Sequence, residues 1–140
     1  MQYRRSGDYI VLRLDEGDEV ISGITGVCTK ENFQAGVILS FVGALKECEL
    51  VFREGCRRSF EEHFEVNGNG NITTMNNEVK VHLHIVAGND MNVRSGHLVT
   101  GIVTIFCEVV IKKLEGLEMV RTLDKSLDPQ MVLFPYRLNP

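Results

Sequence analysis

The chain has 140 residues, a length typical of one domain around a single hydrophobic core. Apolar residues make up 44% of it, which excludes a disordered chain, and no apolar run approaches the roughly eighteen residues of a membrane-spanning helix. The N-terminal residues show no secretory signal, so we expect a cytoplasmic protein with one domain over residues 1–140. The formal net charge of −4 argues against direct nucleic-acid binding, which usually relies on a basic surface.

The first elements predicted along the chain are a strand and a helix. Residues 9–14 are rich in β-forming side chains and predict a strand. From Glu19 onward, apolar residues recur at helical spacing, namely Val20, Ile21, Ile24, Val27 and Cys28. Asp18 is the expected N-cap, and the helix is expected to end within residues 32–36.

The rest of the chain predicts strands separated by turns. Six segments are rich in valine, isoleucine, phenylalanine and leucine, and they are residues 37–42, 48–53, 59–66, 79–87, 97–111 and 118–122. Turns are predicted at residues 43–44, 53–55, 67–71 and 88–90. Residues 67–71 are glycine-rich, but they lack the lysine and the following helix of a phosphate-binding loop, so we interpret them as a turn. One early helix and many antiparallel strands predict an α+β fold with a single sheet or open barrel. The apolar C-terminal segment 128–140 must pack on its own domain or on another subunit.

The cysteines show no close pairs in sequence, and they are Cys28, Cys48, Cys56 and Cys107. Without a secretory signal, they are expected to be free thiols that behave as small apolar residues. A four-cysteine zinc site is the less favoured alternative, because structural zinc ligands usually come in close pairs.

Three of the four histidines lie between residues 81 and 98, and they are His82, His84 and His97. If a hairpin turn is centred between Asp90 and Met91, the numbers of facing residues add up to 181, so His84 faces His97. His82 and His84 are two residues apart and share one face of their strand, while residues 81, 83 and 85 point into the core. All three imidazoles are therefore expected to meet, unless the register slips by one residue.

Three neutral imidazoles at this spacing suit a divalent transition metal, and zinc is the expected ion. Zinc prefers nitrogen ligands in tetrahedral geometry, so three histidines leave a fourth position for water. Such a site can lower the pKa of a bound water or polarise a carbonyl. Iron, nickel or copper would also accept imidazoles. The alternative is that the histidines only alternate on an exposed strand and bind no ion.

Two further residues are candidates for roles near the histidines. Glu108, a lone acid in an apolar run, is the candidate for a catalytic base. Its odd separation from His97 places it on the other face of a regular strand, where it would be a solvated or hydrogen-bonded acid, but a bulge at Gly101 would return it to the histidine face. His63 has several acidic neighbours and is expected to be a surface residue rather than a metal ligand.

The residues around the histidines form a series of motifs: Val81-His-Leu-His84, Ala87-Gly-Asn-Asp90, Gly96-His-Leu98 and Glu108-Val-Val-Ile111. This series resembles the signature of the PPC domain, a family named for its conservation in plants and prokaryotes. Weaker upstream matches extend the resemblance to nearly the whole chain, and they lie at residues 13–19, 42–45, 64–66 and 70–72.

The resemblance implies an α+β domain that assembles as a homotrimer and is similar in fold to acetolactate decarboxylase. It also implies a metal, usually zinc, held on His82, His84 and His97. In plants the domain follows AT-hook segments that bind DNA, while the domain itself mediates assembly and partner contacts. This chain has no Arg-Gly-Arg core of an AT-hook, and it has Ser95 where the family usually has glycine. The first departure weakens the expectation of DNA binding, and the second affects the loop geometry next to His97.

Two functions therefore stay open. The first is a trimeric metal-binding protein that carries out chemistry on a small molecule. The second is a regulatory or protein-interaction module, associated with DNA, in which any metal is structural. The sequence fixes neither the substrate nor whether the chain is an enzyme.

Overall fold

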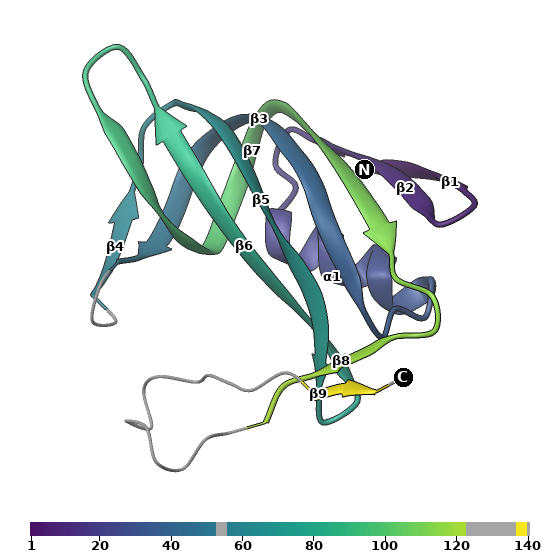
Figure 1. The fold of residues 1–140 in the computed structure, drawn as a ribbon. Coiled ribbons are helices and arrows are strands. Elements are labelled where there is room, and N and C mark those ends of the chain that lie inside the picture. The colour runs from purple at the N-terminus through teal and green to yellow at the C-terminus, as the bar shows by residue number, and fades with distance from the viewer. Residues whose placement is uncertain (53–55, 123–136, 140) are drawn as a thin grey trace.

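The computed structural model describes residues 1–52, 56–122 and 137–139, and this part of the chain forms one helix and nine strands (Figure 1). The elements are β1 (Gln2–Ser6), β2 (Tyr9–Asp15), α1 (Val20–Lys30), β3 (Gly36–Val51), β4 (Arg57–Phe60), β5 (Phe64–Met75), β6 (Glu78–Gly88), β7 (Val93–Lys113), β8 (Glu118–Val120) and β9 (Arg137–Asn139). Nearly all strand pairs are antiparallel, and the exception is the short contact between β5 and β8. The predicted α+β class is confirmed.

Four of the strands close into a ring. β7 pairs with β3, β3 pairs with β5, β5 pairs with β6, and β6 pairs back with β7. The ring closes because β7 is 21 residues long, so its first part reaches β6 while its last part reaches β2. The predicted single sheet is therefore confirmed, and it closes into a small barrel rather than an open one. The β1–β2 hairpin and β8–β9 extend it on opposite sides.

Helix α1 supplies the apolar residues that complete the core. Its buried side chains pack into the same cluster as the inward-facing residues of the strands, and they are Val20, Ile24, Val27 and Cys28. The N-cap is Glu19, whose carboxylate accepts hydrogen bonds from the backbone N–H groups of Ile21 and Ser22. The prediction of Asp18 as the cap was wrong by one residue, because the Asp18 carboxylate accepts from the backbone N–H of Asp15 instead.

Two segments predicted as turns lie inside strands. Residues 43–44 belong to β3, where Gly43 has a positive φ of 148° next to a register shift against β7. Residues 67–71 belong to β5, where a Cβ on Gly68 or Gly70 would overlap the backbone carbonyl of His84 or His82 on β6. The glycines serve close strand contact here, which a sequence pattern does not distinguish from a turn. The predicted strand 59–66 is divided between β4 and β5, and β1 was not predicted.

The cysteines mostly behave as predicted. Cys28, Cys48 and Cys107 are buried free thiols, while Cys56 is exposed. Burial raises the pKa of Cys28 to about 12 and the pKa values of Cys48 and Cys107 to about 11, so all three stay protonated and unreactive at neutral pH.

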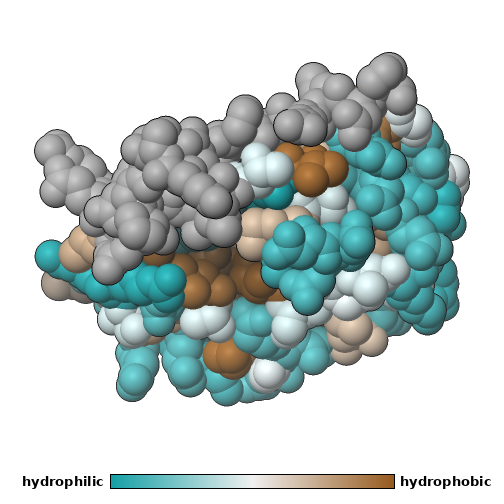
Figure 2. All heavy atoms as spheres, turned by 90° about the horizontal axis from the view of Figure 1, so that it is seen from below, coloured by the Kyte–Doolittle hydropathy of each residue, from teal (hydrophilic) through white to brown (hydrophobic). Residues whose placement is uncertain are grey.

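The described surface mixes polar and apolar residues. Seen from below, most of the coloured surface is hydrophilic, and apolar residues gather near its middle (Figure 2). No helix in the described ranges is long and apolar enough to cross a membrane. Most of the C-terminal segment 128–140, for which packing was predicted, lies outside the described residues.

Candidate metal centre

The hairpin that joins β6 to β7 sets the register of the histidines. Its last strand pair is Gly88 with Val93, and the backbone N–H of Asn89 donates to the carbonyl of Asn92 at 2.9 Å. The Asn89 side chain also accepts from the backbone N–H groups of Met91 and Asn92. The turn is therefore centred between residues 90 and 91, as predicted, and His84 pairs with His97.

The three histidines converge on the outer surface of the barrel. The ring centroid of His82 lies 5.0 Å from that of His84 and 5.0 Å from that of His97, and the centroids of His84 and His97 are 5.5 Å apart. His84 is exposed, and the other two are half-buried. Leu83 and Ile85, which alternate with them, are buried in the core. The predicted convergence is confirmed, because it follows from the turn position and from the two-residue period of the strand.

The cluster is compatible with a transition metal. One ligand nitrogen from each ring lies within 4.8 Å of the other two. Zinc–imidazole bonds are about 2.0–2.1 Å long, so the nitrogens of one tetrahedral site lie roughly 3.3 Å apart. Small rotations of the three rings would bring their nitrogens to the shorter separation that zinc requires. Among the described residues, the cluster contains no cysteine or carboxylate, so the protein offers three ligands and leaves a fourth position open.

The electrostatic environment keeps two of these rings neutral. Burial lowers the pKa of His82 to about 4, with further lowering by the positive charge of Arg121 and by the other two histidines. Burial also lowers the pKa of His97, again helped by His84 and Arg121. A neutral imidazole has a free lone pair, which is the form that binds metals. Both rings are therefore in the metal-binding form at neutral pH.

Polar residues from neighbouring elements border the histidines, and sequence analysis missed them. On β5, Asn71 pairs with His82 and Asn69 pairs with His84. Arg121 follows β8 and donates from Nε to Thr73 Oγ1 at 2.7 Å and from Nη2 to Asn71 Oδ1 at 3.5 Å. The alternation of asparagine and glycine in residues 67–71 could have indicated these amides, had the segment been read as a strand.

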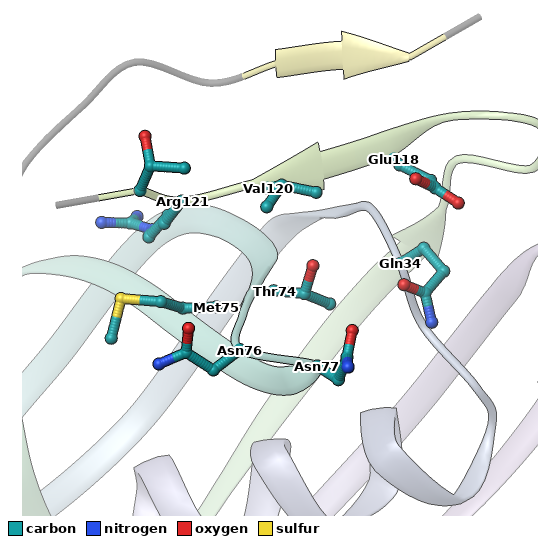
Figure 3. Close-up of a pocket in the computed structure, with 9 residues that line it drawn as sticks. Gln34, Thr74, Met75, Asn76, Asn77, Glu118, Val120 and Arg121 are labelled. Atoms are coloured by element: carbon teal, nitrogen blue, oxygen red, sulfur yellow. The ribbon is translucent and has the colours of Figure 1, made fainter.

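A cavity of about 450 Å³ lies beside this region. Gln34, Thr74 and Glu118 line it together with Arg121 and the β5–β6 turn (Figure 3). Figure 3 shows Arg121 at the end of β8, on the side of the cavity away from Gln34 and Glu118. The histidines are not among the described residues that line this cavity, whereas Arg121 lines it and also contacts Asn71, which pairs with His82.

The two other candidates lie outside the cluster. Glu108 is exposed on β7, between Arg13 of β2 and Val42 of β3. The sequence left open whether a bulge at Gly101 returns Glu108 to the histidine face; Gly101 itself pairs with Cys48, and the nearest register shifts between β3 and β7 fall on either side of it. A catalytic role for Glu108 stays a prediction. His63 is exposed and contacts Glu65 through Nε2 at 2.9 Å, which agrees with its expected place on the surface.

Fold and site together define a small α+β barrel with a three-histidine cluster on its outer surface. The model of the Plants and Prokaryotes Conserved (PCC) domain matches residues 1–115. The chain therefore belongs to this family, which is the PPC family that the motifs resemble. Among curated proteins, no sequence is similar enough to count as a relative.

Several solved structures share the fold. A candidate DNA-binding protein from Bacteroides thetaiotaomicron is 27% identical, with a TM-score of 0.84 over 97% of this chain and 96% of its own. A plant- and prokaryote-conserved (PPC) protein from Pyrococcus horikoshii is 27% identical, with a TM-score of 0.77 over 89% of this chain and 88% of its own. A metal-containing protein from Archaeoglobus fulgidus is 24% identical, with a TM-score of 0.79 over 98% of this chain and 99% of its own.

The predicted similarity to acetolactate decarboxylase is confirmed at the level of the fold. The enzyme from Bacillus subtilis is 13% identical, with a TM-score of 0.53 over 74% of this chain and 51% of its own. Such a match shows a shared fold and carries no information about the reaction.

Proposed function

We propose that this chain binds a divalent metal ion, preferably zinc, through His82, His84 and His97. The observation that carries the proposal is the convergence of three ligand nitrogens within 4.8 Å on one face of the β6–β7 hairpin. The metal content of the Archaeoglobus fulgidus protein, which has the same fold, agrees with it. Zinc is preferred because imidazole nitrogen and a three-ligand open site are typical of catalytic zinc centres.

We further propose that the site serves a small-molecule ligand rather than a purely structural role. With three protein ligands, the bound metal would supply Lewis acidity at a fourth, exchangeable position. The exposure of His84 leaves that position accessible from solvent. The chain's own contribution is to hold the rings of His82 and His97 neutral and in place, since burial and Arg121 disfavour their protonated forms.

We propose that the protein acts in the cytoplasm as a homotrimer of one domain over residues 1–140. The trimer is what the resemblance to the PPC family implies, and the surface offers a face for it. Val11 of β2 is 54% exposed, Leu39 and Val42 of β3 are 51% and 42% exposed, and β7 lies between these two strands. The register places Val11 next to Val110, which in turn lies beside Ser40 of β3, so the apolar residues share one outer face across β2, β7 and β3, which also carries the exposed Glu108 beside Val42. A second copy of the chain would cover that face.

Elemental analysis of the purified, untagged protein tests the metal site. We expect about one zinc per chain, and we expect His84→Ala to lose it because two imidazoles bind zinc much more weakly than three. His63→Ala is the matched control, since His63 is exposed and contacts Glu65 outside the cluster. Metal retained by His84→Ala, or absent from the parent protein after reconstitution with zinc, would contradict the proposal.

A second candidate is a DNA-associated interaction module, which is favoured by the naming of the Bacteroides thetaiotaomicron protein. The charges of this chain oppose it. Arg5 pairs with Glu31, and Arg57 pairs with Glu49, at 2.9 and 3.0 Å respectively, so these cations are already neutralised. A parent protein without metal would make the interaction module the better assignment.

A further inference from the structure

Glu108 places a carboxylate in the apolar outer face of β2, β7 and β3. It is exposed, and it lies between Arg13 of β2 and Val42 of β3. Among the described residues, it makes no hydrogen bond or ion pair. Its cross-strand neighbour Arg13 pairs instead with Asp15 at 3.0 Å. A second copy of the chain that covered this face would bury an unpaired carboxylate, which is strongly unfavourable unless the copy supplies a partner for it.

The histidine cluster lacks the group that Glu108 carries. Three neutral imidazoles leave the charge of a bound divalent ion uncompensated, and within the described ranges no carboxylate belongs to the cluster. Zinc binds carboxylate oxygen as well as imidazole nitrogen. A carboxylate at the open position would complete four ligands, and expansion to five would still admit a small molecule.

The Glu108 of the same chain is too far away to fill that position. The register places Glu108 beside Val42 of β3, and Val42 beside Asn67 of β5. Asn67 pairs in turn with Val86 of β6, which is two residues from His84 on the same face. Glu108 is therefore three strands away, or roughly 14 Å at about 4.8 Å per strand. A glutamate side chain has only three carbon–carbon bonds of about 1.5 Å each, so it cannot span that distance.

Apolar residues also lie on the histidine side of this surface. Val86 and Val93 are exposed on the β6–β7 hairpin that carries the histidines. The outer surface of the barrel thus has two apolar patches side by side, one with Glu108 and one with the histidines. Contacts between two different patches generate closed rings of subunits. In such a ring, the Glu108 patch of one copy covers the histidine patch of the next.

We propose that the metal site is shared between two copies of the chain, with Glu108 of one copy as the fourth ligand beside His82, His84 and His97 of the next. Glu108 then has a cationic partner in the interface, and the metal gains the negative charge that the histidines do not supply. This inference rests on the proposed metal site and on the proposed trimer, and it assigns to both a residue that joins them.

Cobalt(II) provides the first test, since it absorbs visible light in a way that depends on its ligands. Glu108→Gln keeps the size of the side chain and removes its charge. We expect this variant to bind cobalt at least tenfold more weakly than the parent protein, with changed visible bands. Glu47→Gln is the matched control, because Glu47 is an exposed glutamate of β3 that lies opposite Ile102. It should bind cobalt like the parent protein.

Mixed trimers distinguish a shared site from a site within one chain. Glu108→Gln and His84→Ala chains are co-expressed with two different affinity tags that contain no histidine, and trimers with both tags are purified. In every such ring, only one interface joins intact histidines to an intact Glu108. We therefore expect about one site per mixed trimer with the cobalt affinity and visible bands of the parent protein, which neither variant shows alone.

Each other outcome is informative. A parent protein that takes up no cobalt would contradict the proposed function itself. A parent protein that binds cobalt as a monomer, or a Glu108→Gln variant that binds it as tightly as the parent, would overturn the shared site. Weak binding by Glu108→Gln without recovery in the mixed trimers would place the effect of Glu108 within its own chain, and would also overturn it.

Discussion

At the scale of single residues, the glycines of β5 determine how closely that strand lies against the histidines. Gly70 pairs with Leu83, and the hydrogen that it carries in place of a side chain faces the backbone around His82 and Leu83. A Cβ there would overlap the His82 carbonyl, and backbone atoms cannot move away as a flexible side chain can. The position of the His82 backbone therefore depends on a residue of the neighbouring strand.

We predict that Gly70→Ala lowers the free energy of unfolding by about 3 kcal/mol, at the upper end of the cost of overpacking a core. It should also weaken cobalt binding, because His82 shifts with its backbone. Urea unfolding and cobalt titration measure the two effects. Gly26→Ala is the matched control: Gly26 is exposed in α1 with open space around it, so alanine should stabilise the helix by about 0.5–1 kcal/mol. A Gly70→Ala protein as stable as its parent would refute the close-contact explanation.

The histidines could be predicted from the sequence, while their neighbours could not. His82, His84 and His97 lie on two strands joined by a short turn, so a two-residue period and a turn position were enough to bring them together. Asn71 lies on β5, which a two-residue turn joins to β6, but residues 67–71 were read as a turn, so its pairing with His82 was missed. Arg121 is 37 positions beyond His84 in the printed sequence, and contacts between segments that distant in sequence are not encoded by local patterns.

At the scale of elements, Glu19 connects the helix to the barrel. Its carboxylate accepts from the backbone N–H groups of Ile21 and Ser22 at the start of α1. It also accepts from Thr100 Oγ1 at 3.1 Å and from the backbone N–H of Gly101 at 3.2 Å, both in β7. One side chain thus caps the helix and fixes its first turn to the strand that carries His97.

Glu19→Ala is predicted to lower the free energy of unfolding at pH 7 by about 1–3 kcal/mol, through loss of the cap and of the contacts to β7. The effect should depend on pH. Burial alone would raise the pKa of Glu19, but the hydrogen bonds from Ser22, Ile21 and Gly101 outweigh it, so the pKa is lowered from 4.5. The folded state therefore binds this proton less readily than the unfolded state.

It follows that the stability contributed by Glu19 is fully present above about pH 4.5, and is lost as the pH falls through the lowered pKa of the folded state. Thermal unfolding of both proteins from pH 7 to pH 3 measures the difference between them. The difference in stability between the parent protein and Glu19→Ala should become smaller towards pH 3. Glu16→Ala, at an exposed position in the same turn, should stay within about 0.5 kcal/mol of the parent throughout. A stability difference between the parent protein and Glu19→Ala that does not change with pH would contradict the ionic role of Glu19.

Element types were predicted better than element boundaries. The helix and most strands were found because apolar periodicity reports which face is buried. β3 was predicted as two strands, because Gly43 was read as part of a turn, whereas the structure continues the strand through a register shift. The 21 residues of β7 were predicted with a later start, because Arg94, Ser95 and Gly96 near the hairpin tip carry little apolar signal. Bends within long strands depend on their partners, so the sequence alone divides them.

At the scale of the whole molecule, closure of the barrel separates an inner face from an outer one. The inner face is filled by α1 and by the alternating apolar residues of the strands. The outer face changes character across the sheet. Over β2, β7 and β3 it exposes Val11, Leu39 and Val42, and further along, over β5 and β6, it carries the asparagines and histidines. The register joins the two parts directly, since Val42 pairs with Asn67. The apolar face and the proposed metal site thus lie on one continuous surface.

If three copies cover this apolar face in a closed ring, each chain uses one patch on this face and a second, different patch on its neighbour. Sedimentation should then give a mass of about 47 kDa, three times the 15.8 kDa of the chain. Leu39→Asp places a charge in the centre of the face, and desolvating it costs several kcal/mol, so the variant should sediment as a monomer. Met91→Asp is the matched control, because Met91 is 80% exposed at the tip of the β6–β7 hairpin. A parent protein that is monomeric at micromolar concentration, or a Leu39→Asp variant that stays trimeric, would show that this face is not the interface.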